Sequence, residues 1–291
     1  MSNRDQSAVL VTGASTGIGW ATVECLVQDG CLVFAGVRRE EDGDRLLATF
    51  QDRVHPVRLD VTRSEDLEAA RGVVQDHLHG RGLAGLVNNA GIAIGGPLEY
   101  VAPEALRKQL EVNVIGLHAV TREFLDLVRQ GHGRVVHIGS ISGRIGSPFI
   151  GPYAASKHAV EALADALRQE LMPEGIHVAV IEPGQVRTPI WDKGVKSSGA
   201  ISDAIPPEGK ARYRSRLQAF RFLLEQAPRH AIEPREVALA VRHALFAAEP
   251  KARYVLGRDA QVRLFLSRLL PIRVMDALVA RFFTNLERRA G

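Results

Sequence analysis

The sequence predicts a doubly wound α/β fold, with a parallel sheet of about seven strands, helices on both faces and a helical C-terminal extension. Short apolar runs rich in β-branched residues alternate with longer amphipathic segments, which is typical of βαβ units. The runs are almost continuously apolar, as expected for strands that are covered on both faces. No internal repeat or linker divides the chain, so we expect a single domain over residues 1–291.

The expected elements follow one another in a regular order. An apolar strand at residues 8–12 leads into a glycine-rich turn at 13–19 and a helix at 20–27. A turn and a proline–glycine pair end later strands at residues 88–91 and 183–184. The remaining strands are expected at residues 32–37, 54–60, 83–87, 133–141, 176–181 and 253–256, and the long helices at 64–78, 102–128 and 153–171.

Cysteine content and hydropathy exclude several classes of protein. The two cysteines, Cys25 and Cys31, lie in one strand–helix unit without the spacing of metal ligands. We therefore expect neither a disulfide framework nor a metal site, and a reducing cytoplasmic compartment. Residues 1–7 are polar, and no apolar stretch approaches the roughly 20 residues that a membrane span needs, so neither a signal peptide nor a spanning helix is expected.

Positive charge is concentrated in the tail. The whole chain carries a net charge of +4, whereas residues 251–291 hold nine Lys or Arg against three Asp or Glu. A basic tail can bind nucleic acid or anionic lipid. Because no nucleic-acid motif accompanies it, we expect no nucleic-acid partner and favour a solvated helical surface. A membrane-surface contact through Arg263, Arg268 and Arg273 is the less favoured alternative.

The glycine-rich turn indicates a phosphate-binding site. Glycines after a first strand let the backbone approach a pyrophosphate, and the following helix offers free N–H groups and a positive dipole end. The spacing differs from the G-x-G-x-x-G of the commoner dinucleotide fold, and a simple glycine turn is the alternative. The candidate residues are Gly13, Ser15, Thr16, Gly17, Ile18 and Gly19.

Two arginines follow the second expected strand. An NAD site normally has an acidic residue there to hold the adenosine ribose, but Arg38 and Arg39 occupy these positions. An arginine can hold a 2′-phosphate through two hydrogen bonds. The pair therefore favours NADP over NAD, although NAD stays possible and the arginines could simply be solvated.

Three residues form a candidate proton-transfer site. Ser140 closes a strand, and Tyr153 and Lys157 lie four residues apart, on one face of a helix. An adjacent ammonium should lower the pKa of a tyrosine, which is otherwise a poor base at neutral pH. Ser140 could steady charge on a substrate oxygen. Taken alone, such a pair is more often surface packing.

Taken together, the ordered motifs resemble the short-chain dehydrogenase/reductase family over about residues 8–190. The resemblance implies a Rossmann-type domain, divided into a cofactor-binding and catalytic core at 7–184, a substrate loop at 185–230 and a C-terminal helical extension at 258–291. It also implies a reversible hydride transfer between a nicotinamide cofactor and a carbonyl or alcohol. The motifs are Thr12-Gly13-x3-Gly17-Ile18-Gly19, Asp60, Asn88-Asn89-Ala90-Gly91, Asn113, Ser140, Tyr153-x3-Lys157 and Pro183-Gly184-x3-Thr188.

The same resemblance assigns roles to the residues. Tyr153 is implied to be the general acid/base, Lys157 to hold the nicotinamide ribose and lower the pKa of Tyr153, and Ser140 to orient the substrate oxygen. Asn113 is implied to interrupt its helix and bind a water that relays protons. Further cofactor contacts are implied for Asp60, Val61, Asn89, Ala90, Gly91, Pro183, Gly184, Val186 and Thr188.

The chain looks most like the hydroxysteroid and retinol dehydrogenase branch of the family. That branch implies a lipophilic alcohol or ketone as substrate, with a general carbonyl reductase of small ketones or aldehydes as the alternative and a non-catalytic nicotinamide-binding scaffold as a remote one. A homodimer or homotetramer through helices 102–128 and 153–171 is also implied by the family. The expected substrate pocket comprises Ser140, Phe149, Ile150, Tyr153, Ile190 and Trp191.

Overall fold

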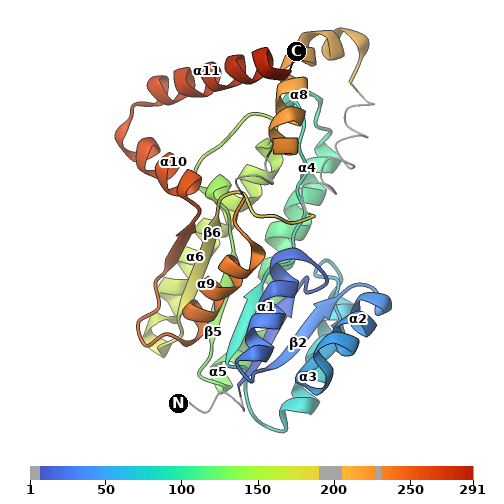
Figure 1. The fold of residues 1–291 in the computed structure, drawn as a ribbon. Helices are drawn as coiled ribbons and strands as arrows, with labels where there is room; N and C mark the ends of the chain where they lie inside the picture. Colours follow the sequence, from blue (N-terminus) through green and yellow to red (C-terminus); the bar gives the residue numbers. More distant parts are fainter. Residues whose placement is uncertain (1–6, 190–204, 227–230, 291) are drawn as a thin grey trace.

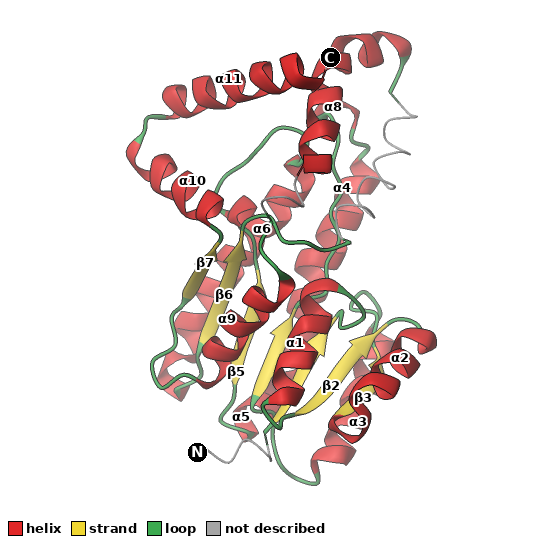
Figure 2. Cartoon of the chain, viewed as in Figure 1, coloured by secondary structure: helices red, strands yellow, loops and turns green. Residues whose placement is uncertain are grey.

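The computed structural model describes residues 7–189, 205–226 and 231–290. Its centre is a seven-stranded sheet in the order β3-β2-β1-β4-β5-β6-β7, with every neighbouring pair parallel (Figures 1 and 2). The order reverses at β1, which lies between β2 and β4, and this confirms the predicted doubly wound sheet. The strands are β1 (Ala8–Thr12), β2 (Leu32–Val37), β3 (Val54–Arg58), β4 (Gly85–Asn88), β5 (Arg134–Ile138), β6 (Val178–Pro183) and β7 (Arg253–Leu256).

Helices cover both faces of the sheet. Side chains alternate along β1, so that Val9 and Val11 pack with helices α1, α2 and α9, whereas Ala8 and Leu10 pack with α3, α5 and α6 on the opposite face. Burial on both faces explains why the strands are almost continuously apolar. These helices are α1 (Gly17–Gln28), α2 (Glu40–Phe50), α3 (Ser64–Leu78), α5 (Leu117–Gln130), α6 (Gly151–Leu171) and α9 (Pro234–Phe246).

The expected elements are present, with two differences. Helix α2 was not among the expected elements, because its charged sequence EEDGDRLLATF places few apolar residues on the core side. The expected helix at 102–128 consists of α4 (Pro103–Leu110), a π-helical turn (Glu111–Gly116) and α5. The π-helical turn carries Asn113, which agrees with the prediction that the helix is interrupted there.

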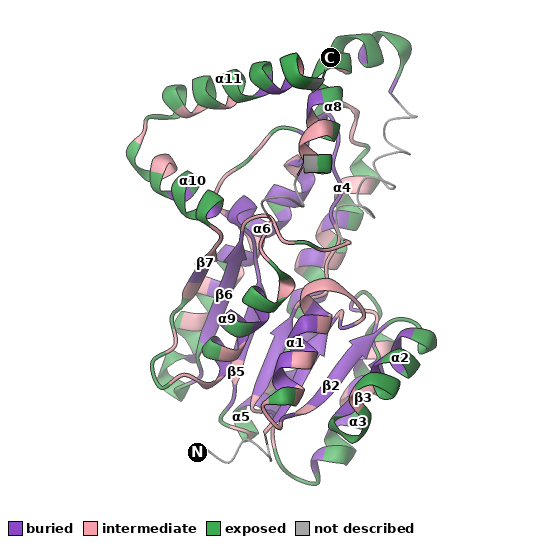
Figure 3. Ribbon diagram, in the orientation of Figure 1, coloured by how far each residue is buried: buried purple, intermediate pink, exposed green. Residues whose placement is uncertain are grey.

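Three further helices stand above the carboxyl ends of the strands (Figure 1). They are α8 (Pro207–Gln226), α10 (Arg258–Leu269) and α11 (Ile272–Ala290), and the last two form the predicted helical extension, with its break at Pro271. Residues of α11 pack on α8, whereas much of α10 and α11 is exposed (Figure 3). Within the described ranges, no helix is both long and apolar enough to cross a membrane.

Candidate active site

A single large cavity of about 2000 Å³ opens at the carboxyl ends of the strands. One end reaches the turn after β1, the middle lies over β4, β5 and the start of α6, and the far wall is made by α8, α10 and α11. This is the crevice in which doubly wound folds bind their ligands. This volume is larger than that of an ordinary ligand pocket, so the cavity can hold a dinucleotide and a second molecule.

Hydrogen bonds hold the turn after β1 against the end of β4. The hydroxyl of Thr12 accepts hydrogen bonds from the backbone N–H groups of Asn89 and Ala90, each at 3.0 Å. The amide of Asn89 donates in return to the carbonyls of Thr12 and Gly13, at 2.9 and 3.0 Å. Gly13 has φ 64°, in the left-handed region that favours glycine. The glycine turn therefore holds its shape through a partner about 75 residues away in the chain.

Most of the predicted phosphate-binding residues line the cavity, but Gly19 does not. A Cβ on Gly19 would lie 2.2 Å from the carbonyl oxygen of Gly13 and 2.6 Å from the Asn89 amide nitrogen. Gly19 therefore lets the first turn of α1 pack beneath the loop, and its contact with the cofactor stays a prediction. The residues of the turn that do line the cavity are Gly13, Ser15, Thr16, Gly17 and Ile18.

Arg38 and Arg39 both line the cavity at the end of β2, but their surroundings differ. The buried carboxylate of Asp42 accepts from Arg39 and from Arg45, at 3.1 Å each. Arg45 also donates to the carbonyl of Ser15 at 2.5 Å, so Arg45 connects Asp42 and Arg39 to the phosphate-binding turn. Asp42 and Arg45 were not predicted, because their i, i+3 spacing after Arg39 looks like an ordinary exposed helical pair.

The predicted adenosine-side residues also line the cavity. Asp60 and Val61 follow β3, and one carboxylate oxygen of Asp60 accepts from the N–H and the hydroxyl of Thr62, at 3.0 and 2.7 Å. These hydrogen bonds outweigh partial burial, so the pKa of Asp60 lies below its ordinary value. At the opposite, nicotinamide side, the cavity wall contains Asn89, Ala90, Gly91, Pro183, Gly184, Val186 and Thr188, as predicted.

Ser140, Tyr153 and Lys157 come together as predicted and are all buried. Ser140 follows β5, and its side chain hydrogen-bonds that of Tyr153 from the first turn of α6. The Ser140 hydroxyl also accepts from the N–H of Ser142, at 3.1 Å, which fixes its rotamer. The ammonium of Lys157 donates to the carbonyl of Ile138 at 2.6 Å, and its nitrogen is 5.8 Å from the centre of the Tyr153 ring.

Burial controls the protonation of this group. It raises the pKa of Tyr153, and the hydrogen bond with Ser140 opposes the rise only in part. The expectation that Lys157 lowers this pKa is not met, since the lysine ammonium is directed to the carbonyl of Ile138. Burial also lowers the pKa of Lys157 to about 8, against the opposing effect of Glu161. At neutral pH the site therefore holds a neutral phenol beside an ammonium.

Asn113 supports the site from outside the cavity wall. Its side-chain oxygen accepts from the N–H of Ile92 at 2.9 Å, and its amide nitrogen donates to the carbonyl of Ile92 at 3.0 Å and to the Ser156 hydroxyl at 3.1 Å. The side chain thus ties the segment after β4 to the helix that carries Tyr153. The relay water that the family resemblance implies for Asn113 stays a prediction.

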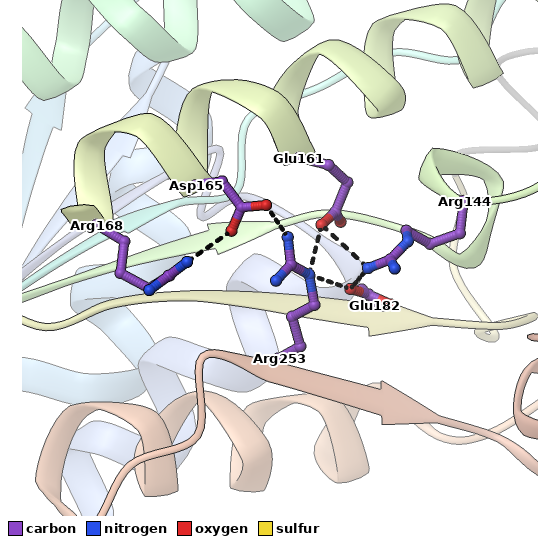
Figure 4. A network of polar contacts seen from close by, with 6 residues as sticks. All are labelled: Arg144, Glu161, Asp165, Arg168, Glu182 and Arg253. Atoms are coloured by element: carbon purple, nitrogen blue, oxygen red, sulfur yellow. Dashed lines mark hydrogen bonds and ion pairs between the residues drawn. The ribbon is translucent and has the colours of Figure 1, made fainter.

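A buried ion network lies behind the catalytic helix (Figure 4). The nearly fully buried carboxylates of Glu161 and Glu182 share Arg144 and Arg253, with Arg253 at 3.0 Å from Glu161 and 3.2 Å from Glu182. Arg144 lies 3.3 Å from Glu182. Burial and the adjacent Glu182 hold the pKa of Glu161 above its ordinary value. Because Glu161 is one turn beyond Lys157 and Arg144 is four residues beyond Ser140, the network connects both site segments to β6 and β7.

The substrate end of the cavity is mainly apolar. Ile150 lines it as predicted, whereas Phe149 does not. The ring of Phe149, whose φ is 68°, packs in a cluster with Tyr213, Phe220 and Phe283, and the last two line the cavity. Phe149 thus lies behind the cavity wall, and its place in the substrate pocket stays a prediction. The predicted Ile190 and Trp191 lie outside the described residues. The apolar lining instead includes Phe220, Leu223, Leu224, Leu266, Met275, Leu278, Val279 and Phe282.

In the part of the chain that the structure describes, no group of three or more His, Cys, Asp or Glu is placed to hold a metal ion. Cys25 and Cys31 are both buried. His137 is buried and hydrogen-bonds Asn88 at 3.2 Å, and burial lowers its pKa to about 4. Tyr153, Lys157 and Ser140 are thus the side chains with proton-transfer chemistry that meet at the centre of the cavity.

Comparisons with known proteins agree with this geometry. The family model described as short chain dehydrogenase matches residues 7–198. The chain is 34% identical to an NADPH-dependent 3-dehydrocapnine reductase of Ornithobacterium rhinotracheale, over 96% of this chain and 97% of that protein. It is 36% identical to human retinol dehydrogenase 16, over 93% of this chain and 87% of that protein.

Solved structures agree as well. A short chain dehydrogenase from Burkholderia cenocepacia, crystallised in complex with NADP, superposes with a TM-score of 0.70 and 27% identity. The superposition covers 95% of this chain and 97% of that one. With its parallel sheet, its buried Tyr153–Lys157 pair and relatives that match it almost end to end, the chain belongs to the short-chain dehydrogenase/reductase family, in the branch that resembles hydroxysteroid and retinol dehydrogenases.

Proposed function

We propose that this oxidoreductase uses NADP(H) to interconvert a lipophilic secondary alcohol and its ketone, or an aldehyde and its alcohol. The observation that carries the proposal is the buried hydrogen bond between Tyr153 and Ser140, with Lys157 beside it. It lies between a phosphate-binding turn at one end of the cavity and an apolar wall at the other. A small carbonyl as substrate is the alternative, and the same assay distinguishes the two.

The proposed chemistry assigns the proton to Tyr153. A bound nicotinamide supplies or accepts the hydride at the substrate carbon. In the reductive direction the Tyr153 hydroxyl donates its proton to the carbonyl oxygen, while the Ser140 hydroxyl donates a hydrogen bond to that oxygen. The raised pKa of Tyr153 keeps the phenol protonated at neutral pH, which suits reduction. Alcohol oxidation needs the phenolate and should accelerate as the pH rises.

Lys157 and Asn113 complete the proposed site. With a pKa of about 8, Lys157 stays largely an ammonium at neutral pH and can donate to the hydroxyls of a nicotinamide ribose. Asn113 is a positioning residue that holds the segment after β4 against α6.

The preference for NADP rests on Arg38. Asp42 already accepts a hydrogen bond from Arg39, which leaves Arg38 as the better candidate for the 2′-phosphate. Support comes from the name of the NADPH-dependent reductase and from the NADP complex of the Burkholderia cenocepacia enzyme. We expect Arg38→Ala to abolish the preference for NADPH over NADH and Arg39→Ala to reduce it less. Equal cofactor preference in wild type and Arg38→Ala would contradict this role.

The size and lining of the cavity favour a bulky apolar substrate. Nearly all of the side chains that α8 and α11 contribute to it are apolar, as expected for a pocket that recognises hydrocarbon surface. The similarity to retinol dehydrogenase 16 supports the same class. A cytoplasmic location and a homodimer or homotetramer through α5 and α6 stay predictions, and analytical ultracentrifugation tests the assembly.

The decisive experiment follows NADPH absorbance with steroid, retinoid and small carbonyl substrates. Tyr153→Phe should abolish turnover while NADPH binding, measured by fluorescence, persists. Tyr254→Phe removes the hydroxyl from another buried tyrosine, on β7, and should retain activity. Full activity in Tyr153→Phe would contradict the mechanism, and turnover of small carbonyls alone would favour the alternative substrate class.

A further inference from the structure

Helix α10 exposes one apolar face. Val262, Phe265 and Leu269 recur at i, i+3 and i+7, so they lie on one side of the helix. Each side chain is between 56% and 63% exposed, and none of the three lines the cavity. Scattered exposed apolar residues are ordinary, but a continuous row marks an interaction surface.

Helix α11 exposes a second apolar row. Val274, Leu278 and Phe282 recur at i, i+4 and i+8 and are each more than 40% exposed. The face that packs on α8 is a different one, since Phe283 and Leu286 are buried there. The helix is therefore held to the protein by one row of apolar side chains, while Leu278 and Phe282 of the other row border the cavity.

Arginines flank both rows. Arg268 precedes Leu269, Arg273 precedes Val274 and Arg281 precedes Phe282 in the chain, and all three arginines are exposed. Residues 258–290 contain seven arginines and three acidic residues, a net charge of +4. Long arginine side chains beside an apolar row can direct their guanidinium groups outward to an anionic layer while the apolar row is buried.

The same two helices border the mouth of the cavity. Leu266 of α10 and Met275, Leu278 and Phe282 of α11 belong to its lining. Figures 1 and 3 show α10 and α11 as an exposed arm that stands away from the sheet above the carboxyl ends of the strands. The exposed apolar surface is therefore continuous with the wall of the substrate site.

We propose that this arm, α10 and α11, docks on the surface of an anionic phospholipid membrane. The apolar row of α10 enters the boundary between headgroups and acyl chains, the arginines lie at the level of the phosphates, and the α11 row borders the cavity mouth beside them. The arm lies along the membrane rather than across it. A second copy of this chain is a poorer occupant, because a symmetric contact would bring two positively charged arms together.

Docking places the cavity mouth at the lipid surface, so a lipophilic substrate can pass from the membrane to Tyr153 without crossing water. This delivery step rests on the proposed function, whereas docking itself depends only on the arm. The sequence analysis favoured a solvated basic surface. The exposed apolar row of α10 reverses that preference, since it is not part of the cavity wall and has no role on a surface that faces only water.

Vesicle sedimentation tests docking with the full chain. Wild type should sediment with phosphatidylcholine–phosphatidylglycerol vesicles and bind pure phosphatidylcholine much less. Arg268→Gln with Arg273→Gln should weaken binding by about fivefold per arginine. Phe265→Gln with Leu269→Gln should weaken it by more than about tenfold. Matched controls are Lys251→Gln with Arg235→Gln for the charge and Met172→Gln for an exposed apolar side chain, and both should bind as wild type does.

Defined outcomes overturn the proposal. Equal sedimentation of wild type and the Phe265/Leu269 variant, or equal binding to neutral and anionic vesicles, would refute it. Sedimentation velocity that detects a dimer dissolved by the Phe265/Leu269 substitutions would assign the arm to a second copy instead. Tyr153→Phe should still bind vesicles, so a chain that sediments but reduces no carbonyl would contradict the proposed function alone.

Discussion

Lys157 should make the stability of the protein depend on alkaline pH. Burial lowers its pKa from the ordinary 10.5 to about 8 in the folded chain. Between these two values, the unfolded chain binds a proton that the folded chain has lost. The free energy of unfolding therefore rises as the pH rises through this window, and below pH 8 the folded state bears the full penalty of a buried ammonium.

The magnitude follows from the size of the shift. A difference of about 2.5 pH units at 1.36 kcal/mol each corresponds to about 3 kcal/mol. Lys157→Met has no group that titrates at this position. From pH 7 to pH 10.5, the free energy of unfolding of the wild type should therefore rise by about 3 kcal/mol relative to that of the variant. The lost hydrogen bond to the Ile138 carbonyl changes the variant's stability by an amount that does not vary with pH.

Urea unfolding of both proteins at a series of pH values measures the difference. Lys251→Met is the matched control, because it removes an exposed lysine and its curve should stay parallel to that of the wild type. Parallel curves for wild type and Lys157→Met from pH 7 to pH 10.5 would refute the reasoning. They would mean that the folded protein solvates the Lys157 ammonium as well as water does.

Three further predictions concern the frame around the site. Gly19→Ala should destabilise the fold by more than about 3 kcal/mol and weaken cofactor binding, because its Cβ would collide with the Gly13 carbonyl. The control is Gly72→Ala in α3, whose Cβ meets no atom within 4 Å and which should stabilise the fold slightly. Equal melting temperatures of the two variants would contradict this prediction. Arg253→Met should lower the free energy of unfolding, measured with urea, by about 3 kcal/mol, because Glu161 and Glu182 lose a partner. Adding Glu182→Met should recover part of that stability. If the double variant recovers none, the unpaired carboxylates are not the cause of the loss. Phe149→Ala should cost about 3 kcal/mol in thermal unfolding, as a packed core ring does, and an unchanged stability with an altered KM would place Phe149 in the substrate pocket.

Much of the fold was predictable because its signals are local. A short apolar run marks each strand in the sequence, and the glycine turn follows β1 directly. The ends of the strands were less predictable: the strand expected at 54–60 ends at Arg58, where pairing with β2 stops. Helix α2 was missed because it covers only the edge of the sheet and needs few apolar residues there. Its sequence therefore looks like that of a solvated, charged segment.

The catalytic residues were predictable for a different reason. Ser140, Tyr153 and Lys157 are identified by an ordered set of motifs, although nothing in their local sequence distinguishes the pair from surface packing. The environment of Tyr153 was not predictable. Spacing places Lys157 on the same helix face, but only the folded chain reveals that its ammonium donates to the Ile138 carbonyl and that burial dominates the tyrosine pKa.

The remaining misses share one physical cause, which is contact between segments far apart in the chain. The ion network joins Arg144, Glu161, Glu182 and Arg253, none of which belongs to a local motif. A buried pair of carboxylates is stable only when both arginines pair with it. These ion pairs form only after the sheet has assembled, so the sequence alone does not reveal them. The network spans the turn after Ser140, the helix of Tyr153 and strands β6 and β7. It follows that the two carboxylates, which a sequence presents as ordinary surface charges, hold the proton-transfer group in register with the last strands of the sheet.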